Sequence, residues 1–206
     1  MLIYGLKAVA HMLILLGPSA SGKTESAKIM LNRYPISRVV TCTTRPKRVN
    51  EIEGFDYQFV TEEEFDRLVE TKYFAETAIY NGFHYGTPLH QLRDDKLIIL
   101  EPRGLASFAK LRVCTIVAIY LQTNESVRFE RMRYRGDTKE EAESRLASDR
   151  ERFDLTHIAH VDMVIDTTNM SASDIADMIY GNYKFLLGKK QNPFEQMQLF
   201  PEEEGF

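Results

Sequence analysis

The chain has 206 residues, of which 44% are hydrophobic and 27% charged, a composition typical of a protein with one packed domain. The net charge of −4 argues against general binding to nucleic acid, and no stretch has the length of a membrane span. Cys42 and Cys114 lack the spacing of a metal site or a disulfide framework. The N-terminus matches a signal peptide poorly, so we expect a cytoplasmic protein that contacts neither membrane nor nucleic acid directly.

A glycine-rich motif follows the first predicted strand. Residues 12–16 are an apolar run, and residues 17–24 read GPSASGKT, the pattern G-x-x-x-x-G-K-T. In such a loop backbone N–H groups surround phosphate oxygens, Lys23 adds a positive charge, and the Thr24 hydroxyl is placed to bind Mg²⁺. The helix predicted after Gly22 directs its positive end at the same anion. The residues expected to bind the phosphates are Gly17, Ser19, Ala20, Ser21, Gly22, Lys23, Thr24 and Glu25.

Strands and helices alternate along the rest of the chain. Strands are predicted at residues 38–43, 56–60, 97–100, 115–121 and 161–166, and helices at 25–33, 61–72, 125–134, 138–153 and 171–187. Capping boxes open the helices at Thr61 and Thr138, and Asn81-Gly82 indicates a hairpin between residues 73–80 and 83–85. The pattern predicts an α/β fold, with a P-loop-type parallel sheet flanked by helices and an antiparallel unit inserted at about residues 36–92.

The inserted unit carries a second group of polar residues. Arg45 and Arg48 either converge on one phosphate or form an exposed charged loop. Tyr57 and Tyr85 either donate hydroxyls to that phosphate or are simply half-buried. Glu76, in an apolar stretch, is either an outward strand residue or an acceptor for a ligand. One carboxylate matches the neighbouring N1–H and 2-amino donors of guanine, a pair that adenine lacks.

Four segments, in order over residues 12–187, resemble the guanylate kinase family. They are the phosphate loop, TTRPKRVNEIEGFDYQFVTEEEF, FAETAIYNGFHYGTP and YRGDTKEEAESRL. The resemblance implies a core at residues 12–35 and 93–187, a mixed α/β lobe for the nucleoside monophosphate at 36–92, and a helical lid at about 134–150. Residues 1–11 would then be an N-terminal extension and residues 188–206 a flexible tail.

The resemblance also implies an activity and a role for each matching residue. It implies ATP-dependent phosphorylation of GMP, and of dGMP, with Mg²⁺ as cofactor. Lys23, Arg45, Arg135 and Arg145 would be catalytic, although Arg135 and Arg145 equally fit a solvated helix face. The residues implied to bind GMP are Thr41, Arg45, Arg48, Tyr57, Glu76, Tyr85, Gly86, Thr87 and Glu101.

Some positions depart from the family pattern. Ile99 and Glu101 stand where the family has an Asp-x-Asp pair. Glu101 either assists guanine or a water on Mg²⁺, or it is the polar end of a buried strand. Asn50 replaces a glycine, and Asp166 begins a segment that is asparagine-led in the family. Two other functions stay open: a catalytically inactive guanylate-kinase-like binding module, and a P-loop kinase for a different small phosphorylated acceptor.

The tail carries a separate motif. Residues 188–206 are polar, contain two prolines and lack helical periodicity, so we expect a flexible end. Within it, Gln196, Leu199 and Phe200 resemble the short sliding-clamp-binding motif of bacterial replication proteins. Contact with a sliding clamp through these apolar anchors is a further hypothesis.

Overall fold

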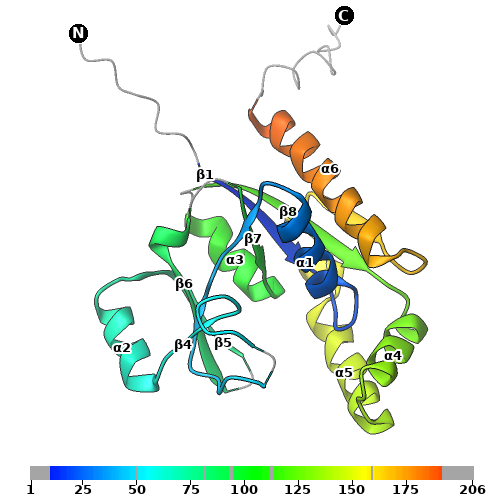
Figure 1. Ribbon diagram of the computed structural model, residues 1–206, viewed down its shortest axis with the longest axis horizontal. Coiled ribbons are helices and arrows are strands. Elements are labelled where there is room, and N and C mark those ends of the chain that lie inside the picture. Colours follow the sequence, from blue (N-terminus) through cyan, green and yellow to red (C-terminus); the bar gives the residue numbers. More distant parts are fainter. Residues whose placement is uncertain are drawn as a thin grey trace, which may run out of the picture.

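The computed structural model describes residues 10–49, 51–80, 82–92, 95–111, 114–158 and 160–191 (Figure 1). Residues 1–9 of the predicted N-terminal extension lie outside the described residues, as does Asn50. The proposed clamp motif at Gln196, Leu199 and Phe200 also lies outside them, so that hypothesis stays untested. Among the helices that the structure describes, none is long and apolar enough to span a membrane.

Five parallel strands form the central sheet, in the order β2-β7-β1-β8-β9. The strands are β1 (Ala10–Leu16), β2 (Ser37–Arg38), β7 (Lys96–Ile99), β8 (Cys114–Gln122) and β9 (Met163–Asp166). This arrangement confirms the predicted parallel sheet. A parallel sheet is normally covered on both faces, and this explains the continuous apolar runs in its strands.

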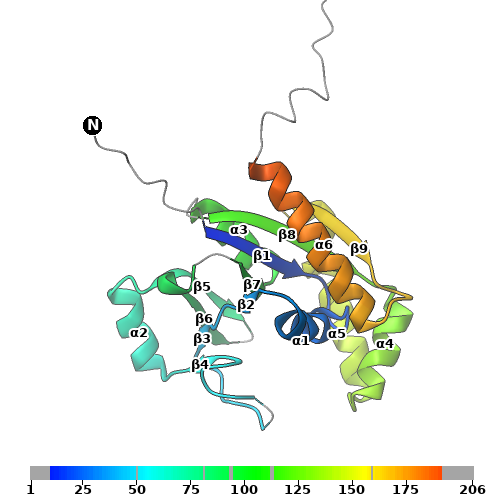
Figure 2. The same cartoon turned by 45° about the horizontal axis from the view of Figure 1, so that its top comes forward.

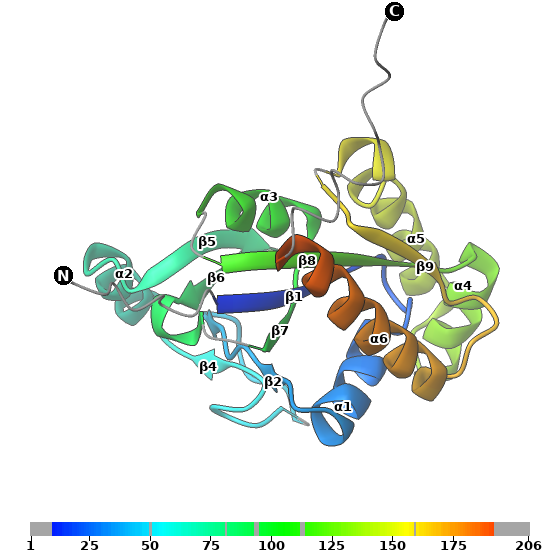
Figure 3. The ribbon, with the colours of Figure 1, turned by 90° about the horizontal axis from the view of Figure 1, so that it is seen from above.

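Helices cover both faces of the central sheet. Leu13 and Leu15 of β1 lie in one buried cluster with residues of α1 (Lys23–Arg33) and α6 (Ala172–Gln191). Met12 and Ile14 lie in a second cluster, with residues of α3 (Pro102–Leu111). Figure 3 shows α3 on one face and both α1 and α6 on the other. The middle strand is therefore held from both sides, and the phosphate loop begins at its end.

A second sheet forms a smaller lobe, with strand order β4-β3-β6-β5. Its elements are β3 (Cys42–Thr43), β4 (Gln58–Phe59), α2 (Glu62–Glu70), β5 (Phe74–Tyr80), β6 (Phe83–Pro88) and the short turn η1 (Leu89–Gln91). We call these residues, 41–91, the acceptor lobe, after the role that the family resemblance implies for them. The β5–β6 pair confirms the predicted hairpin, with Tyr80 opposite Phe83.

Two helices pack beside the phosphate loop at the other end of the molecule. They are α4 (Glu125–Tyr134) and α5 (Lys139–Arg152), followed by the turn η2 (Leu155–His157). Met132, Ala142 and Leu146 form a buried cluster between them, against which Ala20 of the loop packs. Figures 1 and 2 both show the acceptor lobe and this helix pair at opposite ends of the central sheet.

The structure corrects four expectations. The single strand predicted at residues 38–43 is two strands in different sheets, because the chain crosses from the central sheet to the lobe between them. The inserted unit is not wholly antiparallel, since β3 and β4 pair in parallel. Helix α3 was not predicted, although Leu105 and Phe108 have helical spacing. Helix α6 continues past residue 187 to Gln191, and Lys190 in its last turn forms an ion pair with Asp162 at 2.7 Å.

The predicted capping box at the start of α5 is present and gives a test of stability. Thr138 accepts a hydrogen bond from the Glu141 N–H at 3.2 Å, and Glu141 accepts one from the Thr138 N–H at 2.7 Å. We predict that Thr138→Ala lowers the free energy of unfolding by about 1 kcal/mol, because an N–H at the helix start loses its partner. Urea denaturation measures this, with Thr138→Ser as the control that keeps the hydroxyl. Equal losses in both variants would contradict the capping role.

Candidate active site

The phosphate loop turns sharply between β1 and α1. The turn needs both glycines of the motif, Gly17 and Gly22. Gly17 has φ of 139°, and a Cβ there would lie 2.4 Å from the carbonyl oxygen of Leu121. Gly22 has φ of 100° and leads directly into α1, whose first turn has no side-chain cap. Side-chain-bearing residues rarely adopt either conformation. The uncapped helix start leaves backbone N–H groups and the positive helix end available to an anion.

Groups outside the loop hold its carbonyl oxygens. Arg131 of α4 donates to the Ala20 oxygen at 3.2 Å and to the Thr167 oxygen at 3.1 Å. The Thr167 hydroxyl, fully buried, lies 3.0 Å from the Ser21 oxygen and 2.6 Å from the Thr123 hydroxyl. Neither Arg131 nor Thr167 was predicted as a site residue. The spacing of Arg131 and Arg135, four apart on a predicted helix, was the available signal for Arg131.

A buried ion pair lies behind the loop and was also missed. Arg128 of α4 and Asp149 of α5 form an ion pair at 2.8 Å, and Asp149 accepts a hydrogen bond from the Ser19 N–H at 2.8 Å. Their side chains are only 3% and 8% exposed. Sequence reasoning had no local signal for this pair, because each residue reads as one more charge on a polar helix.

Lys23 folds back over the loop. Its Nζ donates to the carbonyl oxygens of Gly17 and Pro18 at 2.6 and 2.7 Å. Burial lowers the pKa of Lys23 to about 8; the nearby charges of Asp149 and Glu101 oppose this shift, and those of Arg128 and Arg145 add to it. Charges from α4, from α5 and from the segment before α3 thus act on one ammonium at the phosphate loop.

A hollow of about 520 Å³ lies beside the start of α1. Gly22 and Glu25 line it from the loop side, Tyr134 and Arg135 from the end of α4, and Met170 from the segment before α6. Arg135 and Tyr134 are exposed, and Glu25 forms a surface ion pair with Lys28 at 3.5 Å. The predicted Arg135 and Glu25 therefore border one space next to the phosphate loop.

Two arginines and two tyrosines gather in the acceptor lobe. Arg45 forms an ion pair with Glu51 at 2.6 Å, and its guanidinium lies 5.5 Å from the centre of the Tyr57 ring. The Tyr57 and Tyr85 rings meet edge to face with centroids 6.0 Å apart. Burial raises the pKa of Tyr57, so its hydroxyl stays protonated and able to donate to an anion.

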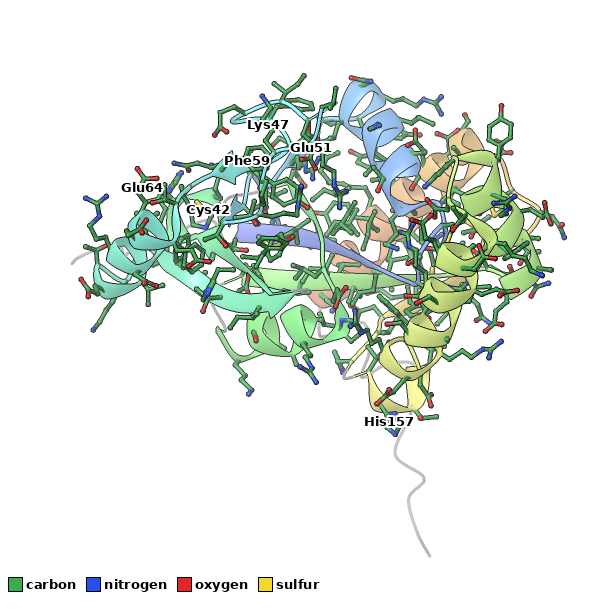
Figure 4. All side chains as sticks on the ribbon, turned by 90° about the horizontal axis from the view of Figure 1, so that it is seen from below. Cys42, Lys47, Glu51, Phe59, Glu64 and His157 are labelled. Carbon is green, nitrogen blue, oxygen red and sulfur yellow. The ribbon has the colours of Figure 1, made fainter. Side chains whose placement is uncertain are left out.

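The loop that carries Arg48 is more open. Glu51 accepts a hydrogen bond from the Arg48 N–H at 2.8 Å, while the Arg48 side chain is exposed. Figure 4 shows Lys47 and Glu51 together on this loop, with Phe59 beside them and His157 far away on the other side of the molecule. The Glu51 carboxylate therefore contacts both predicted arginines: the side chain of Arg45 and the backbone N–H of Arg48.

Glu76 and Thr87 face each other on adjacent strands β5 and β6. The Thr87 hydroxyl, fully buried, donates to Glu76 Oε1 at 2.7 Å. Glu76 Oε2 is buried and has no hydrogen-bond partner among the residues that the structure describes. Burial raises the pKa of Glu76, and the bond from Thr87 opposes this shift. A carboxylate oxygen without a partner in such a place is a costly feature, and a ligand donor would relieve it.

The other predicted residues have different surroundings. Gly86 lies against Phe74, and a Cβ at Gly86 would come within 2.7 Å of that ring. Thr41 precedes β3, and its carbonyl oxygen accepts from Gln58 at 2.9 Å. Arg145 forms an ion pair with Asp137 at 2.6 Å on the exposed side of α5. Glu101 lies at the start of α3, close enough to affect the Lys23 pKa.

Comparisons with known proteins agree with this geometry. A family model described as Guanylate kinase matches residues 9–180. A guanylate kinase from Chlorobium luteolum is 30% identical over 168 residues, which cover 78% of this chain and 85% of the relative. One from Anaplasma phagocytophilum is 34% identical over 184 residues, which cover 84% of this chain and 86% of the relative. The crystal structure of guanylate kinase from Anaplasma phagocytophilum matches with a TM-score of 0.65 and 26% identity, over 86% of each chain. A family match over most of the chain, with the same fold, shows that this protein belongs to the guanylate kinase family.

Proposed function

We propose that the protein transfers the γ-phosphoryl group of ATP to GMP, or to dGMP, and releases ADP and GDP or dGDP. The observation that carries the choice of acceptor is Glu76, whose one carboxylate oxygen is held by Thr87 while the other is buried without a partner among the described residues. Guanine offers two adjacent donors to such a carboxylate, and adenine does not. The family membership of the chain supports the same activity.

The acceptor lobe binds GMP at two points in this proposal. Glu76, Thr87 and Thr41 contact guanine, with Gly86 beside them in β6. Arg45, Arg48, Tyr57 and Tyr85 bind the GMP phosphate. The Arg45–Glu51 pair, with both side chains less than 16% exposed, keeps the Arg45 guanidinium beside Tyr57, so the phosphate meets an ordered donor group.

The phosphate loop and the hollow beside α1 bind ATP. The loop residues 17–24 surround the phosphates, and the adenosine occupies the space bordered by Tyr134, Arg135 and Met170. Lys23 then leaves the Gly17 and Pro18 oxygens and pairs with the β- and γ-phosphates. This exchange of partners is favourable, because an ammonium–phosphate contact is stronger than hydrogen bonds to neutral carbonyls.

Transfer requires alignment and neutralisation of charge more than covalent help. An oxygen of the GMP phosphate attacks the γ-phosphorus in line, the bond from that phosphorus to the β–γ bridging oxygen breaks, and ADP leaves. The attacking oxygen is already anionic, so no general base is needed. Lys23, Arg45, Arg135 and Arg145 offset the repulsion between the two nucleotides and the charge of the transition state.

The residues present fit Mg²⁺ as the cofactor. The Thr24 hydroxyl is exposed at the start of α1, and Glu101 is an oxygen donor close to Lys23. Mg²⁺ in kinases takes one or two protein oxygens together with substrate phosphates and waters, so these two groups suffice. When bound, Mg²⁺ would supply positive charge that offsets the charge of the transferring phosphates. Thr24 would hold it directly and Glu101 through a water.

In this proposal, different parts of the fold bind the two substrates. Residues 12–35 and 93–187 form the core that binds ATP, residues 36–92 bind GMP, and residues of about 134–150 act as a lid. Closure of the lobe and lid excludes water, which would otherwise hydrolyse ATP. The proposal includes a cytoplasmic location, where both substrates are available.

A panel of acceptors tests the activity. ADP release, followed by a coupled assay with GMP, AMP, CMP or UMP, should rise at least tenfold with GMP alone. Glu76→Gln should lose on the order of 100-fold in kcat/KM for GMP, because an amide cannot accept both guanine donors. Its KM for ATP should change less than threefold. Equal stimulation by all four acceptors would exclude a guanylate kinase, and ATP binding without any turnover would indicate an inactive binding module.

The unpartnered Glu76 oxygen also predicts that replacing the Glu76 carboxylate by an amide stabilises the folded protein. A carboxyl group whose pKa is raised by folding favours the folded state at low pH and loses that contribution as pH rises through the folded pKa. Glu76→Gln should therefore raise the free energy of unfolding at pH 7 by roughly 1 kcal/mol and change it little at pH 4. Urea denaturation at both pH values measures this, with Glu70→Gln, at an exposed helix position, as the matched control. A loss of stability at pH 7 would contradict the analysis.

The lowered pKa of Lys23 predicts how ATP binding depends on pH. With a pKa of about 8, the ammonium is charged below pH 7.5 and neutral well above pH 8.5. Affinity for ATP in the absence of GMP should be constant near pH 7 and fall towards tenfold per pH unit as the amine loses its charge. Calorimetric titration from pH 7 to 9.5 measures this. Lys23→Arg, which keeps its charge, should bind more weakly at pH 7 but show no such fall. A flat wild-type profile up to pH 9.5 would contradict the prediction.

A further inference from the structure

We propose that Arg128 and Asp149 form a positioning pair, which holds the Ser19 peptide of the phosphate loop and so sets the affinity of the loop for the phosphates of ATP. The pair touches the loop from behind and contacts no substrate in the proposed site. The inference rests on the proposed function only in taking ATP as the ligand of the loop.

The contacts join three segments that are far apart in the sequence. Asp149 Oδ2 accepts hydrogen bonds from the Ser19 N–H and from Arg128 Nη1, both at 2.8 Å. Asp149 Oδ1 lies 3.4 Å from the Ser19 hydroxyl, and Arg128 Nη1 lies 3.5 Å from the Ser19 carbonyl oxygen. The backbone N–H and the carbonyl oxygen of Ser19 are thus both contacted by side chains of helices α4 and α5.

The loop needs such an anchor because its next residue is strained. Ala20 has φ of 59°, in the left-handed region, which is unfavourable for a residue with a side chain. A strained residue persists only where its surroundings determine it. Ser19 on one side is held by the pair, and the Ala20 and Ser21 oxygens on the other side are held by Arg131 and Thr167.

The anchors also direct the phosphate-binding groups. A peptide unit is planar, and its C=O and N–H point in opposite directions. Where the Ser19 and Ser21 oxygens face their anchors, the N–H groups of Ala20 and Gly22 face the opposite side, where phosphate oxygens bind. The Ala20 N–H belongs to the peptide unit that begins at Ser19, so a Ser19 residue no longer held by Asp149 would misdirect that N–H first.

Stability alone does not account for a charged pair at this place. Taking two charges out of water is unfavourable, and replacing a buried ion pair by apolar residues is often neutral or stabilising. Arg128 also keeps its Nε buried without a hydrogen-bond partner among the described residues. Linking α4 to α5 does not require the pair either, since Glu125 and Arg150 connect the same helices at the surface, at 2.7 Å.

Two double variants isolate the hydrogen bond to Ser19. Arg128→Met with Asp149→Asn removes both charges and keeps a side-chain oxygen that can accept from the Ser19 N–H. Arg128→Met with Asp149→Ala removes both charges and that acceptor. Both avoid an unpaired buried charge, so both should fold, and thermal melting should confirm it. Arg150→Gln is the matched control, because it breaks the surface link between the same helices and leaves Glu125 beside Arg128, at 3.9 Å.

The readout is the dissociation constant for ATP, measured by calorimetry without GMP, together with KM for each substrate. We expect the alanine variant to bind ATP about tenfold more weakly, with its KM for GMP changed less than twofold. The asparagine variant and the surface control should stay within threefold of wild type. Equal ATP affinity in the alanine and asparagine variants would overturn the proposal. ATP binding is measured without turnover, so a wild-type protein that binds ATP and fails to phosphorylate GMP would refute the proposed function and leave this test intact.

Discussion

Each peptide unit of the phosphate loop carries a carbonyl and an N–H that point opposite ways, and the site depends on which one faces the ligand. An anion needs the N–H groups, so the carbonyl oxygens must be satisfied by other donors. Arg131 and Thr167 do this for two successive carbonyls, and both come from elements beyond the loop and its helix. The positions of α4 and of the segment after β9 are therefore part of the phosphate site, although neither contains the glycine-rich motif.

The acceptor lobe differs from the phosphate loop, because it buries a negatively charged side chain instead of offering N–H groups to an anion. Its proposed recognition group is the carboxylate of Glu76, and a carboxylate oxygen kept from water without a partner lowers the stability of the folded protein. The lobe tolerates this because its strands are held by apolar packing nearby. The Phe65 and Phe74 rings stack with centroids 4.7 Å apart, and Gly86 leaves room for Phe74 against β6. Gly86 thus serves the lobe first through packing, which the sequence motif alone did not indicate.

The features that were predictable from sequence are those encoded locally. The glycine motif, the two capping boxes and the hairpin each depend on residues a few positions apart, and all are present. Residues 38–43 were misjudged because β propensity does not say which sheet a strand joins. The Arg128–Asp149 pair was missed because the partner of Asp149 in the loop, Ser19, lies 130 residues away. Burial of a charged side chain is a tertiary property, and a polar helix pattern conceals it.

The proposed reaction also requires the two halves of the site to move relative to each other, and the contacts between them suit such a motion. Arg38 at the end of β2 pairs with Asp56 of the acceptor lobe at 3.1 Å and lies 5.7 Å from the centre of the Tyr57 ring. Both charged side chains are about one-fifth exposed, so water screens the pair and its contribution to stability is modest. A pair of this strength links the lobe to the central sheet and would yield in the closure proposed above. Because Arg38 also contacts the ring of Tyr57, a proposed phosphate ligand, one side chain would link the proposed closure to binding of the GMP phosphate.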